Sequence, residues 1–257
     1  MEQVREIARR TGIPVHLLRL GDQGGEVPAK RRDFAAAVTL AMLPWPKLPQ
    51  TDEGSSAAAL TAITAAQRRL DASTPSRELV RGVAAHVELA TRMAGHSSGS
   101  QSSAAVASAL SEAAGFAGWL YADMCDHGTA RTYYRLAVTA GWRARHDLLA
   151  GYMLGSLAAF EIGCGDHVSG LGLIQQARQQ IGGAAHPTPQ AWLACLEALG
   201  HATTHQDERA ADAALDRAGE AIAGKDALTQ PPWPWMFAFD DAKLAGYRAL
   251  VYVRPCR

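Results

Sequence analysis

The chain has 257 residues, of which 48% are hydrophobic and 19% charged, and its formal net charge is zero. Such a composition is typical of a globular, alanine-rich helical protein and excludes a wholly disordered chain. The balanced charge excludes a chain-wide basic surface for nucleic acid. No apolar run approaches the roughly 20 residues that span a membrane, so no membrane partner is expected.

Three regions follow one another along the chain. Residues 1–27 hold two short helical patterns, which we interpret as the remnant of a preceding helical domain. Residues 28–56 predict a linker with one helix at about 30–43, because a proline-rich stretch follows that helix. Residues 57–257 predict the main domain.

Helical periodicity dominates the main domain, and no segment shows the alternation of a strand between turn signals. The fold class is therefore predicted to be all-α. The helices are expected at about 57–72, 77–94, 104–125, 127–140, 144–163, 167–181, 188–205, 207–223 and 235–253.

A spacing of about 40 residues recurs in this domain. Small and large residues fall at the positions where a tetratricopeptide repeat lets two antiparallel helices approach and fills the groove between them. The residues in question are Gly118, Tyr121, Ala130, Tyr134 and Ala137, then Gly170, Ile174 and Ala177, then Ala211, Leu215 and Ala218.

Each helix pair leaves an apolar face that a neighbouring pair can cover, which predicts tetratricopeptide-like pairs stacked as a right-handed solenoid. The last helix, at about 235–253, has no second helix after it. Its exposed face is predicted to include Leu244, Leu250 and Val251 and to promote self-association, so a homo-oligomer is expected.

Four segments carry a resemblance to a known family. They are residues 6–18, residues 31–34, residues 151–157 and the late group at 231–233, 239–241 and 244–247. With them the chain resembles the actinobacterial regulators that join an N-terminal phage-repressor-type (XRE-type) helix-turn-helix to a C-terminal tetratricopeptide-like domain.

The resemblance implies a transcriptional regulator. In the family the recognition helix lies upstream of the segment at which this chain begins, so a chain truncated at the N-terminus, and at the C-terminus in mid-repeat, is expected. No DNA-binding residue carries over, and DNA is a partner of full-length relatives only. The remaining domain would bind a peptide, a small molecule or a protein and mediate oligomerisation. The alternative is a free-standing protein–protein adaptor with no DNA role.

The binding face is expected on the concave side of the solenoid. Phased to the repeat, this side includes Trp119, Asp123, Tyr152, Ala159 and Thr203, and the two aromatic residues are the strongest candidates for ligand contact. A second aromatic group serves either as core packing or as a wall of the ligand site. Its members are Trp233, Trp235, Phe237 and Phe239.

No group of residues predicts catalysis, a cofactor or a metal. His201 and His205 share a helical face, but no glutamate or third ligand accompanies them. Asp126 and Asp166 precede helices and are expected to cap them, with Gly128 or Gly165 making the turn. Asp240 and Asp241 begin a helix, where they complement its dipole.

The cysteines indicate a reducing compartment. Cys125, Cys164, Cys195 and Cys256 form no C-x-x-C pair, and free, mostly buried thiols in a cytoplasmic protein are expected. The segment at 30–43 superficially resembles a twin-arginine export signal, but it lies about 30 residues into the chain behind an amphipathic segment.

Overall fold

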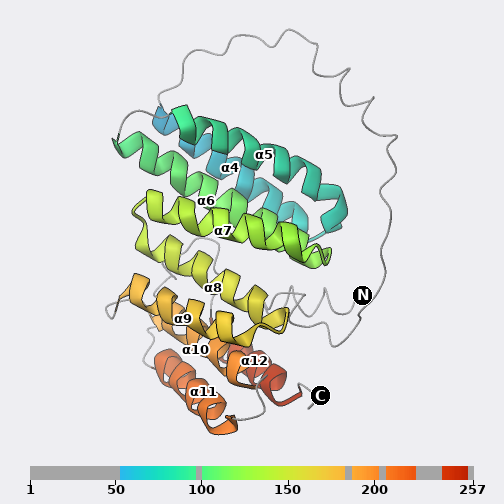
Figure 1. The fold of residues 1–257 in the computed structure, drawn as a ribbon, viewed down its shortest axis with the longest axis vertical. Helices are drawn as coiled ribbons and strands as arrows, with labels where there is room; N and C mark the ends of the chain where they lie inside the picture. The colour runs from blue at the N-terminus through green and yellow to red at the C-terminus, as the bar shows by residue number, and fades with distance from the viewer. Residues whose placement is uncertain (1–52, 97–99, 183–186, 203–206, 224–238, 254–257) are drawn as a thin grey trace.

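A computed structural model describes residues 53–96, 100–182, 187–202, 207–223 and 239–253. Within these ranges every regular element is an α-helix and there is no strand, which confirms the all-α class for this part of the chain (Figure 1). The helices are α4 (Glu53–Asp71), α5 (Ser76–His96), α6 (Ser100–Asp123), α7 (His127–Arg143), α8 (Asp147–Gly163), α9 (His167–Ile181), α10 (Pro187–Ala202), α11 (Glu208–Ala223) and α12 (Asp241–Val253).

Helix bounds follow the sequence pattern closely. α9 occupies the predicted range 167–181, whereas α4 begins at Glu53, so the last residues of the expected linker are helical. α6 begins at Ser100 rather than at 104, which shortens the expected loop before it. The expected remnant at 1–27 and the linker as far as residue 52 lie outside the described residues.

Aspartates begin the second helix of each hairpin. The Asp126 carboxylate accepts a hydrogen bond from the Thr129 amide at 3.1 Å, and Asp166 accepts one from Ser169 at 3.0 Å. Asp207 does the same before α11, with the Ala210 amide at 3.1 Å. These bonds satisfy amides that a helix N-terminus leaves without an intrahelical partner. The predicted capping roles of Asp126 and Asp166 are confirmed.

The residues that turn the chain were predicted correctly in one hairpin only. Gly165 has φ +92° and makes the turn before α9. Before α7 the left-handed residue is Cys125, with φ 64°, whereas Gly128 lies inside α7, so the predicted turn role of Gly128 is wrong. Cys125 is exposed, and its backbone has the left-handed conformation that costs glycine less free energy than other residues.

The helices pack in two kinds of neighbour relation. α6 packs most extensively on α7, α8 on α9, and α10 on α11, so each is an antiparallel hairpin. In addition, α4, α6, α8, α10 and α12 contact one another in succession. The stack runs along the long axis of the molecule, from α4 and α5 at one end to α11 and α12 at the other (Figure 1).

The second-helix positions that carry the 40-residue spacing lie in the core of this stack, whereas Tyr121 on α6 is partly buried and stacks on Tyr133. On the second helices, all members of the three series are buried: Ala130, Gly170 and Ala211; Tyr134, Ile174 and Leu215; and Ala137, Ala177 and Ala218. Gly118 lies directly under Tyr134, because a Cβ atom there would be 2.9 Å from Cγ of the tyrosine ring. The missing side chain therefore lets α6 approach the aromatic ring of α7 closely.

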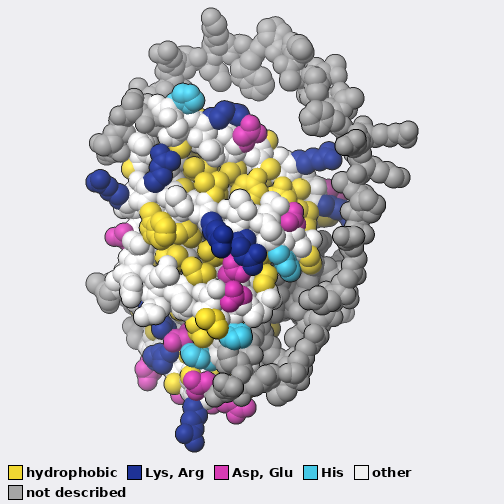
Figure 2. Space-filling model, viewed as in Figure 1, with side chains coloured by type: hydrophobic (Ala, Val, Ile, Leu, Met, Phe, Trp, Pro, Cys, Tyr) yellow, Lys and Arg dark blue, Asp and Glu magenta, His cyan; other side chains and the backbone are white. Residues whose placement is uncertain are grey.

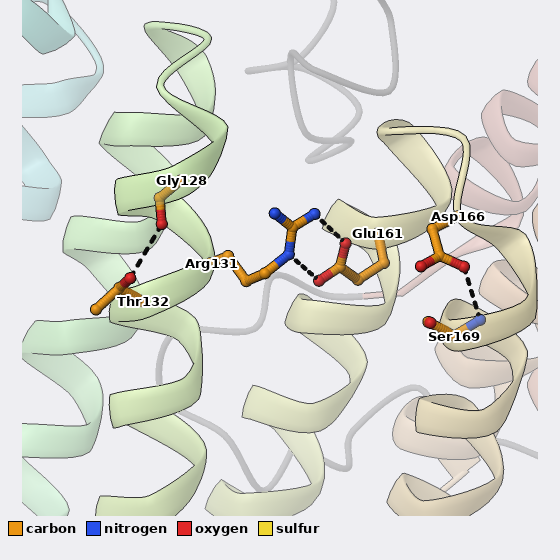
Figure 3. Close-up of polar contacts among 6 residues, drawn as sticks. All are labelled: Gly128, Arg131, Thr132, Glu161, Asp166 and Ser169. Atoms are coloured by element: carbon orange, nitrogen blue, oxygen red, sulfur yellow. Dashed lines mark hydrogen bonds and ion pairs between the residues drawn. The ribbon is translucent and has the colours of Figure 1, made fainter.

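The Arg131–Glu161 ion pair, which is partly buried, joins two hairpins (Figure 3). Arg131 of α7 donates from Nε and Nη2 to the two carboxylate oxygens of Glu161 of α8, each at 2.6 Å. The Glu161 side chain is 6% exposed, and the guanidinium also lies 5.3 Å from the centre of the Phe160 ring. Such a fork-to-fork contact fixes the geometry of both side chains.

The last described helix differs from the expectation. Leu244 and Val251 are 5% and 7% exposed, because α12 packs against α10 and α11. The prediction that these two residues face solvent is therefore wrong, while Leu250 is half-buried against the core. Exposed apolar surface on α12 comes from Tyr252 and Val253 instead.

Candidate ligand-binding face

The first helices of the hairpins leave one row of partly exposed side chains. They are Glu112 and Trp119 on α6, Tyr152 and Ser156 on α8, and Trp192 on α10. We call these five side chains the inner-helix face. α8 is otherwise almost fully buried between α7, α9 and its neighbours α6 and α10, so Tyr152 and Ser156 belong to the one stripe of α8 that reaches solvent.

Two aromatic rings stack across the junction of α8 and α10. The centres of the Tyr152 and Trp192 rings are 5.3 Å apart, and their planes meet at 27°. Gly155 makes the recess for the indole, since a Cβ atom there would lie 2.5 Å from Cζ3 of Trp192. The pair is thus a rigid, half-exposed aromatic surface, of the kind that supplies large contact area at small entropic cost.

Glu112 lies on the same face one repeat before Tyr152. Burial raises the pKa of its carboxyl to about 7, and the positive charge of Arg68 on α4 opposes that rise. The Arg68 guanidinium is itself 5.3 Å from the centre of the Phe116 ring on α6. The face therefore carries a carboxyl that changes its charge near neutral pH.

The raised pKa of Glu112 predicts a stability that falls with pH. The folded state binds the Glu112 proton more tightly than the unfolded state does. The stability that this proton contributes is therefore fully present below about pH 4.5 and is lost as pH rises through about 7. Glu112→Gln keeps the shape without the titration. We expect it to exceed the wild type in unfolding free energy at pH 8 by up to about 3 kcal/mol, and by much less at pH 5.

Urea unfolding of both proteins at the two pH values measures this difference. The contribution of the buried His86 imidazole, whose pKa burial lowers, cancels in the comparison because both proteins contain it. A difference between the two proteins that is the same at pH 5 and pH 8 would contradict the assignment.

The predicted concave residues fall into three groups. Trp119 and Tyr152 are half-exposed members of the inner-helix face. Asp123 is buried and accepts a hydrogen bond from the Ser76 hydroxyl at 2.6 Å, and Ala159 is 2% exposed. Neither of these two presents surface to a ligand. Thr203 lies outside the described residues.

Trp192 and Glu112 were missed in the sequence. Both stand 40 residues from Tyr152, one repeat later and one repeat earlier, so stepping the repeat from Tyr152 finds them. The late aromatic group is described only at Phe239, which is buried with its ring centre 6.1 Å from that of Tyr247. That residue packs in the core; Trp233, Trp235 and Phe237 lie outside the described residues.

The described residues contain no group of three or more His, Cys, Asp or Glu side chains that could hold a metal ion. His201 Nε2 is 4.0 Å from Glu197, and His205 lies outside the described part of the chain. Asp240 accepts a hydrogen bond from the Lys243 amide at 2.9 Å, so it caps α12.

The three described cysteines are free thiols, as predicted, but only Cys195 is buried. Burial raises the pKa of the Cys195 thiol to about 12 and that of the half-buried Cys164 to about 11. Both are therefore poor nucleophiles at neutral pH, because the thiolate is the reactive form. Cys125 is exposed rather than buried, since it lies in the turn after α6.

Comparisons with protein families, with characterised proteins and with solved structures gave no match to this chain. Among the helices that the structure describes, none combines the length and the apolar character needed to cross a membrane.

Proposed function

We propose that residues 53–253 form a tetratricopeptide-like interaction domain whose inner-helix face binds a ligand. Two observations support this architecture. The alternate helices α4, α6, α8, α10 and α12 contact one another in succession, as the first helices of stacked pairs do. The small and large positions of the repeat on the second helices are buried in all three hairpins from α6 to α11.

The observation that carries the binding proposal is the Tyr152–Trp192 stack. It lies half-exposed across two adjacent first helices and is held in place by Gly155. Exposed, rigid aromatic residues are the usual anchors of binding surfaces. A peptide that lies along the face would meet the rings of Tyr152 and Trp192 and the titrating carboxyl of Glu112, so a peptide is the ligand class that we favour over a small molecule.

The regulatory role rests on the family resemblance. In that role the domain would be the sensor body of a helix-turn-helix regulator. A ligand that binds one curvature of the stack more tightly than another would shift the population towards it, by as much as its affinities for the two differ. The spacing of two attached DNA-binding heads would then change with ligand.

Peptide selection tests the binding role. A random linear peptide library is panned against the immobilised chain, and selected peptides are measured against variants. We expect Trp192→Ala and Tyr152→Ala to weaken binding by about 2 kcal/mol each, roughly 30-fold, because both remove an aromatic anchor.

Trp142→Ala is the matched control. It removes an exposed tryptophan from α7, away from the inner-helix face, and should leave peptide affinity unchanged. Circular dichroism melts identify any variant that fails to fold. Selected peptides that bind the Tyr152 and Trp192 variants as tightly as the wild type would remove the inner-helix face from the proposal.

A further inference from the structure

Apart from the inner-helix face, the described residues form a recess where the end of α7 meets the first half of α8 and the second half of α9. It has a volume of about 490 Å³, which is within the usual range of small-molecule sites. Its lining consists of Trp142, Asp147, Leu154, Gln176, Gln179 and Gln180. On the face drawn in Figure 2, uncharged polar side chains and backbone cover most of the left-hand ends of α8 and α9.

A hydrogen bond from the indole N–H fixes the Trp142 side chain in this recess. Its Nε1–H donates to the Gln180 side-chain oxygen at 3.0 Å, and the Gln180 amide donates in turn to the Asp147 carboxylate at 2.7 Å. The tryptophan nevertheless remains 48% exposed. Core packing does not account for a large aromatic ring that is fixed at its edge and left in water.

The lining defines the chemistry of a ligand. Among the described residues, no Lys or Arg side chain lines the recess, so an anion such as a phosphate finds no cationic partner in this lining. The carboxamides of Gln176 and Gln179 each offer both a donor and an acceptor, whereas that of Gln180 is engaged with Trp142 and Asp147. Leu154 supplies an apolar floor that is 2% exposed. A fitting ligand therefore has an apolar face and an edge that both donates and accepts hydrogen bonds.

We propose that this recess binds a neutral saccharide. A pyranose ring presents C–H groups on its faces and hydroxyls around its edge, so it can stack on Trp142 while its hydroxyls bond to Gln176 and Gln179. A cationic ligand fits less well. A cation could lie over the Trp142 ring and beside Asp147, but it would accept no hydrogen bond from the glutamine N–H groups. In addition, the Asp147 carboxylate already complements the N-terminus of α8.

Nuclear magnetic resonance of the indole N–H groups tests the proposal on the full chain. Trp142→Phe removes one indole signal and so assigns it. Glucose, N-acetylglucosamine, maltose and cellobiose are then titrated at millimolar concentrations, with choline and N-acetyl-alanine methylamide as comparison ligands. We expect at least one sugar to shift the Trp142 signal in a saturable manner, and neither comparison ligand to do so.

Variants then test the residues. Trp142→Ala should lower sugar affinity about tenfold, because the stacking surface is lost. Gln180→Met should lower it about fivefold, because the relay that fixes the indole is broken. Val168→Ala, an exposed apolar site on α9 outside the recess, and Tyr152→Ala on the inner-helix face should leave it unchanged.

The outcomes separate the alternatives. No saturable shift with any of the four sugars overturns the proposal. A shift with choline or with the amide, and none with sugar, also overturns it and identifies a cation or a peptide as the ligand. Because peptide binding at Tyr152 is measured separately, failure of either site leaves the other standing.

Discussion

Arg131→Met is expected to destabilise the folded chain by about 1–3 kcal/mol. The substitution removes the guanidinium that donates two hydrogen bonds of 2.6 Å to Glu161. The Glu161 carboxylate is 6% exposed and the Arg131 side chain 33% exposed, so water can replace only part of the lost donors. The methionine retains most of the length of the side chain, so the loss reports the charge rather than a cavity.

Arg92→Met provides the control for this prediction. Arg92 pairs with Glu88 on the same helix, but the two side chains are 58% and 70% exposed. An exposed pair of this kind contributes less than about 0.5 kcal/mol, because water screens both charges. Urea unfolding measures both variants. Equal loss in the two variants would show that the Arg131–Glu161 pair has no special role.

The double variant Arg131→Met/Glu161→Leu separates the net contribution of the ion pair from the cost of leaving the Glu161 carboxylate without a partner. Removing both charges leaves no unpaired group in the interior, so stability should return most of the way towards the wild type. A double variant that is as unstable as the sum of the single ones would contradict this interpretation.

Local signals allowed the helices to be predicted. Asp126 and Asp166 mark helix starts by a capping mechanism that acts within four residues, so the sequence alone contains it. The positions of Ala130, Tyr134 and Ala137 could be predicted for the same reason, because a repeat places like residues in like surroundings. The all-helical class followed from the periodicity.

Contacts between distant segments could not be predicted. Asp123 is buried because Ser76, 47 positions earlier, donates to it, and nothing near Asp123 in the sequence announces that bond. Leu244 and Val251 were assigned to solvent because no later helix covers them, but earlier helices do. Trp192 is half-buried because Gly155 of another helix leaves room for its ring. In each case a residue distant in the sequence determines how far the side chain is buried.

Two glycines of α9 should respond to alanine in opposite directions. Gly170 is packed against α8: a Cβ atom there would lie 2.4 Å from Cγ1 of Ile162 and 3.2 Å from the Ala158 carbonyl oxygen. We expect Gly170→Ala to cost about 1–3 kcal/mol, because the helices must separate or Ile162 must leave its rotamer. A Cβ atom on Gly172 would meet nothing within 4 Å. Gly172→Ala should therefore stabilise the fold by about 0.5–1 kcal/mol, because alanine has the higher helix propensity.

The repeat by itself would predict a harmless Gly170→Ala, because the equivalent residues of the other hairpins are Ala130 and Ala211. The difference lies in the facing position. Forty residues before Ile162 stands Ala122, and 40 residues after it stands Ala202, so by the repeat the other two hairpins have alanine at both positions. In the hairpin of α8 and α9 a larger isoleucine faces position 170, and glycine there leaves it room.

A double-mutant cycle in urea tests whether the Ile162 side chain is what excludes a methyl group at position 170. Ile162→Ala alone should destabilise by about 2–5 kcal/mol, because a buried side chain is lost. In that background Gly170→Ala should cost clearly less than in the wild type, because the contact with the Ile162 side chain is gone and the Ala158 carbonyl oxygen at 3.2 Å remains. The coupling between the two sites should reach about 1–3 kcal/mol. Additive effects of Ile162→Ala and Gly170→Ala would mean that the close approach of α8 and α9 does not depend on this pair.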